Sequence, residues 1–156
     1  MRMNLTRKLG VLAAAGVVLA VAGAVPAGQA LEKPGTVTVT DSETRHAHVD
    51  MGARGVGVGD LDVYTTLLYN KRITPRSIGR GTMVCTAVGA SGQHCSATYV
   101  LPKGQIVVEG VITSRLIYAM AVVGGTGLYD NVRGTLTVTS LRRKPSRELL
   151  VFRLVV

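Results

Sequence analysis

From residue 36 onward, apolar and polar residues alternate along short segments of the chain, and turn-forming residues separate these segments. Alternation with a period of two is typical of β-strands that present one face to a core. We expect strands over residues 36–40 with a continuation at 47–50, and over 60–69, 80–88, 93–101, 105–112, 116–123, 132–141 and 148–156. The pattern predicts an all-β domain, either a single eight-stranded antiparallel barrel or, as an alternative, a two-sheet sandwich.

The first thirty residues have the organisation of a cleavable export signal. Arg2, Arg7 and Lys8 form a basic start, residues 9–25 are an unbroken run of Leu, Val, Ala and Gly, and small residues follow at Gly28 and Ala30. A retained membrane anchor is the alternative, but the apolar run is short for a spanning helix. We therefore predict a signal peptide over 1–30, a mature domain over 31–156 without a membrane span, and a secreted or cell-envelope location.

Both cysteines lie in the predicted mature domain, on neighbouring strands of a predicted hairpin. If its turn is centred on Ala90, residues whose numbers sum to 180 face each other, so Cys85 lies opposite Cys95 and Val88 opposite Gly92. Directly opposed cysteines at a non-hydrogen-bonded site are within disulfide reach. Because disulfides persist outside the cytoplasm, we expect a structural bridge here, with a reactive thiol as the alternative.

Charge and aromatic content limit the classes of partner. The chain carries a net charge of +9, and removing the first thirty residues leaves fifteen basic against nine acidic residues, a net charge of +6. This excess favours anionic surroundings. The cations are scattered, however, and five Tyr, one Phe and no Trp provide few rings for stacking on bases, so no nucleic-acid partner is expected.

The predicted strands over residues 105–112 and 116–123 are apolar on both faces. One face of a barrel strand lines the interior, so apolar residues on the other face imply that something covers the outside. We expect a homo-oligomer, a dimer or a trimer.

Four motifs together carry a family resemblance. They are GDLDVYTTLLY at 59–69, IGRGTMVC at 78–85, GQIVVEG at 104–110 and AVVGGTGLY at 121–129. In this order they resemble the allene oxide cyclase barrel family and its wider kin, the dirigent proteins. The resemblance implies an eight-stranded barrel with an apolar lumen, in which relatives guide the cyclisation or coupling of a reactive apolar molecule without a cofactor. Bacterial proteins of similar barrel type serve as cyclases in polyketide pathways.

The resemblance also implies which residues face the lumen. If the strand over 60–69 is oriented as in the family, Asp62, Tyr64, Thr66 and Leu68 point inward, beside Met83 and Cys85. The residues that we expect to contact a substrate are Tyr64, Thr66, Leu68, Met83, Tyr99, Tyr118 and Met120.

The candidate catalytic residues are Asp62, Tyr64, His46, His48 and Glu109. His46 and His48 occupy the segment where the plant cyclases place an acidic residue and an asparagine, and imidazole suits acid–base chemistry near neutral pH. Exposed histidines on an edge segment are the alternative. Glu109 is either an inward functional group or an outward charge, with Arg115 as a cross-strand partner. No metal site is expected, because nothing in the spacing adds a third ligand such as His94 to the pair.

The resulting hypothesis is a cofactor-independent cyclase of the isomerase or lyase type. Its lumen would steer the stereoselective ring closure, including cycloaddition, of a reactive apolar substrate derived from a polyketide or a lipid. The alternative is a non-catalytic exported barrel that binds a small hydrophobic ligand.

Overall fold

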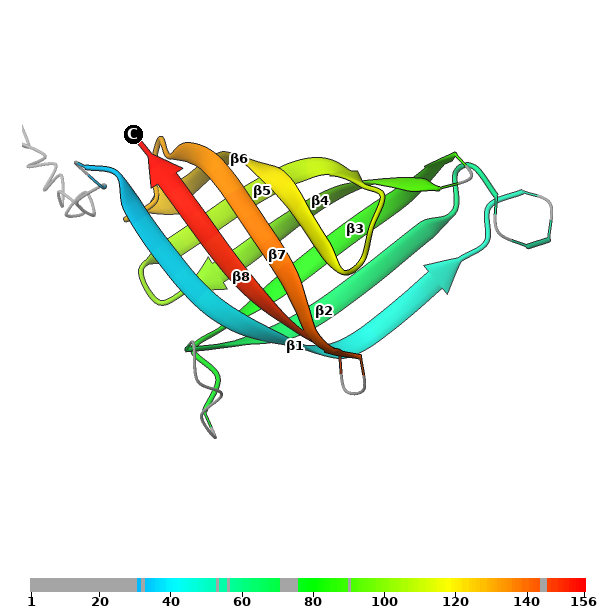
Figure 1. Cartoon of the computed structure of the whole chain (residues 1–156), viewed down its shortest axis with the longest axis horizontal. Coiled ribbons are helices and arrows are strands. Elements are labelled where there is room, and N and C mark those ends of the chain that lie inside the picture. Colours follow the sequence, from blue (N-terminus) through cyan, green and yellow to red (C-terminus); the bar gives the residue numbers. More distant parts are fainter. Residues whose placement is uncertain are drawn as a thin grey trace, which may run out of the picture.

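The computed structural model describes residues 31, 33–52, 54–55, 57–70, 76–89, 91–143 and 146–156, with the side chains of 142 and 143 left aside. The predicted signal peptide lies outside them. The strands are β1 (Gly35–Val49), β2 (Leu61–Asn70), β3 (Gly79–Gly89), β4 (Gly92–Leu101), β5 (Gly104–Ile112), β6 (Ile117–Gly127), β7 (Arg133–Arg143) and β8 (Ser146–Val155). Each pairs antiparallel with the next and β8 pairs with β1, which closes the barrel (Figure 1). The predicted barrel is confirmed, and the sandwich alternative is wrong.

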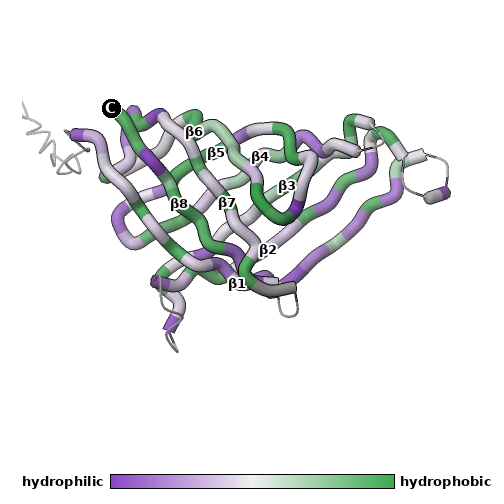
Figure 2. Tube along the Cα trace, in the orientation of Figure 1, coloured by the Kyte–Doolittle hydropathy of each residue, from purple (hydrophilic) through white to green (hydrophobic). Residues whose placement is uncertain are grey.

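The period of two along each strand divides its side chains between the interior and the outer surface, as the alternating colours of Figure 2 show. The largest fully buried side chains include Phe152, Leu68, Ile106, Leu136, Leu150 and Leu154. They form a core toward the chain termini and leave the rest of the interior to a cavity. Within the described residues, no helix is long and apolar enough to cross a membrane.

Strand β1 is one continuous element of 15 residues, so the continuation predicted at 47–50 belongs to the same strand as residues 36–40. A bulge between Glu43 and Arg45 shifts its register against β2. The extra residue, Thr44, donates a hydrogen bond from its hydroxyl to the carbonyl of Thr65 (2.9 Å). Because a bulge changes the face on which later side chains point, His46 and His48 share the inner side with Asp41 and Glu43.

The hairpin of β3 and β4 has the predicted disulfide between Cys85 and Cys95, whose Cα atoms lie 4.0 Å apart. The predicted pairing of Val88 with Gly92 is wrong, since Gly89 pairs with Gly92 across a bulge. The disulfide is buried in the barrel wall.

Strand β6 continues to Gly127, beyond its predicted end at residue 123. Gly124, Gly125 and Gly127 lie within the strand, and the turn follows them. A Cβ on Gly125 would lie 2.3 Å from the carbonyl oxygen of Tyr129 and 2.5 Å from that of Gln105. Close packing of the backbone therefore requires glycine at this position.

Candidate functional site

The barrel encloses a cavity of about 500 Å³, a volume in the range typical of small-molecule sites. Residues of all eight strands line it, together with Arg115 and Leu116 of the β5–β6 connection. The residues that define its chemistry are Asp41, Glu43, Tyr64, Thr66, Met83, Gln93, Tyr99, Arg115, Tyr118 and Glu148.

Four of these residues, Asp41, Tyr99, Tyr118 and Glu148, form what we call the floor cluster. Tyr118 donates a hydrogen bond from its hydroxyl to Glu148 Oε2 (3.1 Å), and the backbone N–H of Glu148 donates to Asp41 Oδ1 (3.1 Å). The ring of Tyr99 packs edge-on against Phe152 of the core, at 5.3 Å between centroids. The cluster therefore joins the core to the cavity.

Burial changes the acid–base properties of the floor cluster. Asp41 is 5% exposed, and this desolvation, followed by repulsion from Glu148, raises its pKa to about 7. Desolvation also raises the pKa of Glu148, although the hydrogen bond from Tyr118 opposes the shift. The pKa values of Tyr99 and Tyr118 are raised by burial, so both phenols stay protonated. The floor therefore holds a carboxyl group that exchanges a proton near neutral pH.

Tyr64 lies between the floor and the mouth of the cavity. It is 6% exposed, and its hydroxyl has no hydrogen-bond partner within the described part of the chain. The Arg115 guanidinium lies over its ring, 5.6 Å from the centroid, and the His46 ring stacks on it at 4.5 Å with an interplanar angle of 5°. The imidazole and the guanidinium therefore both pack against this ring. Burial raises the pKa of the Tyr64 phenol, and the Arg115 guanidinium beside the hydroxyl opposes that shift.

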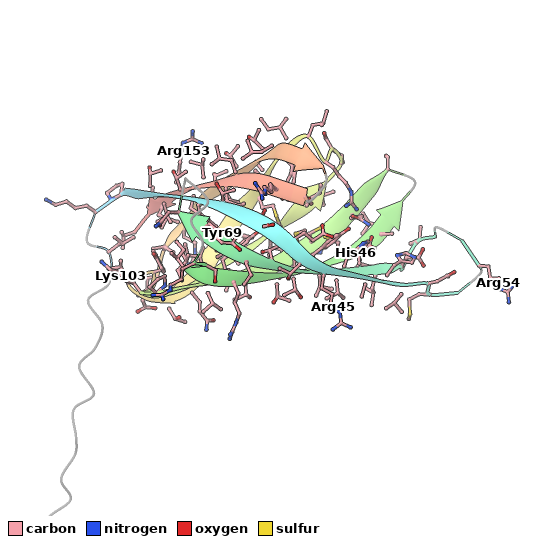
Figure 3. The ribbon with its side chains drawn as sticks, turned by 90° about the horizontal axis from the view of Figure 1, so that it is seen from below. Arg45, His46, Arg54, Tyr69, Lys103 and Arg153 are labelled. Carbon is pink, nitrogen blue, oxygen red and sulfur yellow. A yellow bond between two sulfur atoms is a disulfide. The ribbon has the colours of Figure 1, made fainter. Side chains whose placement is uncertain are left out.

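The mouth network consists of His46, His48, Asp62, Gln93 and Arg115. His46 Nε2 and His48 Nδ1 lie 2.8 and 3.0 Å from Asp62 Oδ1, and both are taken as donors because an ionised carboxylate can only accept. Gln93 Nε2 donates to Asp62 Oδ2 (2.6 Å), and Arg115 Nη2 donates to Gln93 Oε1 (3.0 Å). Figure 3 shows Arg45 pointing away from the barrel, with His46 on the other side of β1.

The mouth network keeps Asp62 ionised. Burial acts to raise its pKa, but the hydrogen bonds from His46, His48 and Gln93 together lower it below its usual value. A carboxylate held in this way is suited to orienting the two imidazoles. The proton-exchanging carboxyl of the cavity is Asp41.

Most residues predicted to contact a substrate lie where the sequence places them. Tyr64, Thr66, Met83, Tyr99 and Tyr118 line the cavity. Leu68 and Met120 point inward as expected, but they are buried in the core cluster beside it.

Glu109 does not lie in the cavity. It is on the outer face of β5, and its partner is His94, with 3.3 Å between Nε2 and Oε1. Arg115, its expected partner, belongs to the mouth network instead. Within the part of the chain that the structure describes, no group of three His, Cys, Asp or Glu residues could hold a metal ion.

Asp41, Glu43, Gln93, Arg115 and Glu148 are cavity residues that the sequence analysis missed. For two of these residues, Asp41 and Glu148, the alternation in the sequence does indicate an inward position. Asp41 continues the inward alternation of Val37 and Val39. Glu148 likewise precedes Leu150, Phe152 and Leu154 at intervals of two.

Asp60, in the motif before β2, has a structural part. Its carboxylate accepts hydrogen bonds from the backbone N–H of Met51 (2.9 Å) and of Gly57 (2.7 Å), and these bonds lower its pKa. It thereby fixes the end of the β1–β2 connection near the mouth.

No protein-family model matches the sequence, and no curated protein is significantly similar to it in sequence. Solved structures do share its barrel. A pyocyanin demethylase has a TM-score of 0.68 and 25% identity, over 78% of this chain and 100% of its own. The pterocarpan synthase dirigent protein GePTS1 has a TM-score of 0.63 and 14% identity, over 78% and 86%. The chain thus has the same barrel fold as these proteins.

The exo-specific intermolecular Diels-Alderase AbnU has the same architecture, with a TM-score of 0.62 and 16% identity over 77% of this chain and 98% of its own. The eight-stranded barrel that the sequence motifs imply is thus confirmed. One fold supports several reactions, so the activity has to be argued from the cavity.

Proposed function

We propose that this barrel is a cofactor-independent enzyme of the isomerase or cyclase type. Its cavity would bind one small conjugated molecule, derived from a polyketide or a lipid, and promote a stereoselective ring closure by moving a proton. The observation that carries the proposal is the pairing of the buried Asp41 carboxyl with the half-buried Glu148, in which the pKa of Asp41 is raised to about 7. An acid–base group is most effective when its pKa lies near the working pH.

The proton transfer follows from the placement of these groups. The Asp41 carboxylate removes a proton from a carbon next to a carbonyl group, and the C–H electron pair moves into the conjugated system. The Tyr64 hydroxyl, which makes no well-formed hydrogen bond among the described residues and lies beside the Arg115 guanidinium, donates a hydrogen bond to the oxygen on which charge develops. Asp41 returns the proton to another atom as the ring closes, so product and substrate have the same composition.

The shape of the cavity supports control over the course of the reaction. Tyr64, Tyr99 and Tyr118 supply flat walls, and Ile112 and Met83 add apolar surface. Such walls select one folded conformer of a flexible molecule and bring its reacting atoms together.

The names of the similar structures support a small organic substrate. They include a pyocyanin demethylase, a pterocarpan synthase dirigent protein and a Diels-Alderase. The predicted export of this chain would place such chemistry in the cell envelope or outside the cell.

Incubation with a panel of small molecules tests the proposal. The panel contains linear conjugated polyenes with a terminal carbonyl group, diene–dienophile pairs and pyocyanin, and products are followed by liquid chromatography and mass spectrometry. We expect at least one member to be converted to an isomer or adduct, and the conversion to be lost in Asp41→Asn.

The matched control is Glu109→Gln, which removes a carboxylate from the outer face of the barrel and is expected to retain the activity. Binding of panel members without conversion, at equal affinity in Asp41→Asn and wild type, would instead identify the protein as a non-catalytic ligand-binding barrel.

A further inference from the structure

The cavity carries an excess of negative charge. Three carboxylates line it, those of Asp41, Glu43 and Glu148, whereas Arg115 is the one cation among the described lining residues. Arg115 lies at the mouth, where it donates a hydrogen bond to Gln93 and covers the ring of Tyr64. The floor therefore has two close carboxyl groups without a cation of its own.

The groups that face Asp41 explain how this charge is tolerated without a ligand. The groups around it are negative or neutral and belong to Glu43, Glu148, Tyr99 and Tyr118. The more distant Arg115 acts to lower the pKa of Glu148. Burial and, after it, repulsion from Glu148 raise the pKa of Asp41 to about 7, and a bound proton relieves both. A positive charge brought by a ligand would replace that proton and relieve the same repulsion.

The walls of the cavity suit such a ligand as well. The three tyrosines Tyr64, Tyr99 and Tyr118 line it, and the faces of aromatic rings attract cations. Independently, the Tyr64 hydroxyl is buried, lines the cavity and has no hydrogen-bond partner among the described residues. A buried polar group of this kind is satisfied when a polar ligand occupies the cavity.

We infer that the molecule bound by this cavity has a flat conjugated portion that carries a positive charge or a basic nitrogen, with its charged centre beside Asp41 and Glu148. The inference rests on the proposed function, because it assigns a substrate class to the same cavity. It departs from the neutral apolar substrate that the sequence motifs imply.

Three probes with the same tricyclic ring test this charge preference: the 10-methylacridinium cation, neutral 9-methylanthracene and the 9-anthracenecarboxylate anion. Their affinities for the wild-type protein are measured by fluorescence titration at pH 8 and at pH 5.5. At pH 8 we expect the cation to bind on the order of tenfold more tightly than the neutral probe, and the anion to bind most weakly. At pH 5.5, where Asp41 is protonated, the preference for the cation is expected to shrink severalfold.

Substitutions in the floor cluster test whether its carboxyl groups cause the preference for the cation. Asp41→Asn and Glu148→Gln are each expected to lower the affinity for the cation severalfold at pH 8 and to leave the affinity for the neutral probe unchanged. Glu109→Gln is expected to leave all three affinities unchanged. Equal binding of the cation and the neutral probe at pH 8 would overturn the inference and leave the proposed ligand cavity standing. If no probe binds, both the inference and the small-molecule cavity are wrong.

Discussion

Asp41 is placed where its ionised form is unfavourable. Its pKa rises from about 3.8 when the chain is unfolded to about 7 in the barrel, so the folded state binds the proton more tightly. The stability associated with protonated Asp41 is therefore fully present below pH 4 and is lost as the pH rises toward and through 7. Residues that lower stability in this way are common at functional sites.

Asp41→Asn should remove this dependence. Its amide oxygen can still accept the hydrogen bond from the Glu148 N–H, but it carries no charge. We expect the variant to be more stable than wild type at pH 8, by on the order of 1–3 kcal/mol in the free energy of unfolding, and equal to it near pH 4. Urea denaturation at both pH values measures this difference. A variant that is less stable than wild type at pH 8 would argue against a destabilising charge at the floor.

Tyr64→Phe should affect the stability of the fold and the binding of a ligand in opposite directions. It removes a buried hydroxyl that has no partner within the described structure, so the free energy of unfolding should stay equal or rise by about 1 kcal/mol. Ligand binding or turnover should nevertheless weaken, since the hydroxyl is proposed to contact the ligand. Thermal denaturation and the probe titration check the two effects, with Tyr69→Phe on the outer face of β2 as the control. Unchanged binding in Tyr64→Phe would remove this residue from the site.

Among the elements, the strands were predicted from their period of two, whereas the inward face of β2 was implied by the resemblance to the barrel family. The disulfide followed from the hairpin register, which holds from Gln93 through Cys95 and on to the end of β4. The bulge at Thr44 could not be predicted, since a threonine in a strand carries no sign of an inserted residue, and this bulge places His46 and His48 on the inner side.

The carboxyl pair was missed for a related reason. Asp41 and Glu148 lie at the ends of apolar alternations, where a charged residue normally marks the point at which a strand meets solvent. Only the pairing of β1 with β8, which places Asp41 opposite Glu148, shows that the two belong to one buried group.

The β3–β4 disulfide should stabilise the fold by restricting the unfolded chain. The bridged cysteines are separated by 10 residues in sequence. Reduction is therefore expected to lower the free energy of unfolding by about 3 kcal/mol. Denaturation with and without dithiothreitol measures the effect, and the Cys85→Ala/Cys95→Ala double variant, which should not respond to the reductant, is the control. Identical unfolding of reduced and oxidised wild type would contradict the expected contribution.

At the scale of the whole molecule, the outer surface of the barrel keeps apolar residues that the cavity does not use. Val111, Ile117 and Val123 on β5 and β6 are exposed, Ile117 by 60%. This surface is where we place the predicted contact between subunits.

Analytical ultracentrifugation tests that expectation. We expect the mature protein to sediment as a dimer or trimer, and Ile117→Lys to shift it toward the monomer because it buries a charge in the contact. Val155→Lys changes a similarly exposed valine at the end of β8 and serves as the control. Wild-type protein that sediments as a monomer at all concentrations would contradict the predicted oligomer.

The proposed function requires that the cavity present Asp41 to a bound molecule as a base. The base-promoted ring opening of 5-nitrobenzisoxazole tests it directly, because a base removes the proton on C3 while the N–O bond breaks, which releases a coloured cyanophenolate. We predict that wild-type protein accelerates this reaction with a rate that rises with pH and is half-maximal near pH 7. We further predict that Asp41→Asn lowers the rate by at least about 100-fold while Glu109→Gln leaves it unchanged. A folded Asp41→Asn variant as active as wild type would contradict the account.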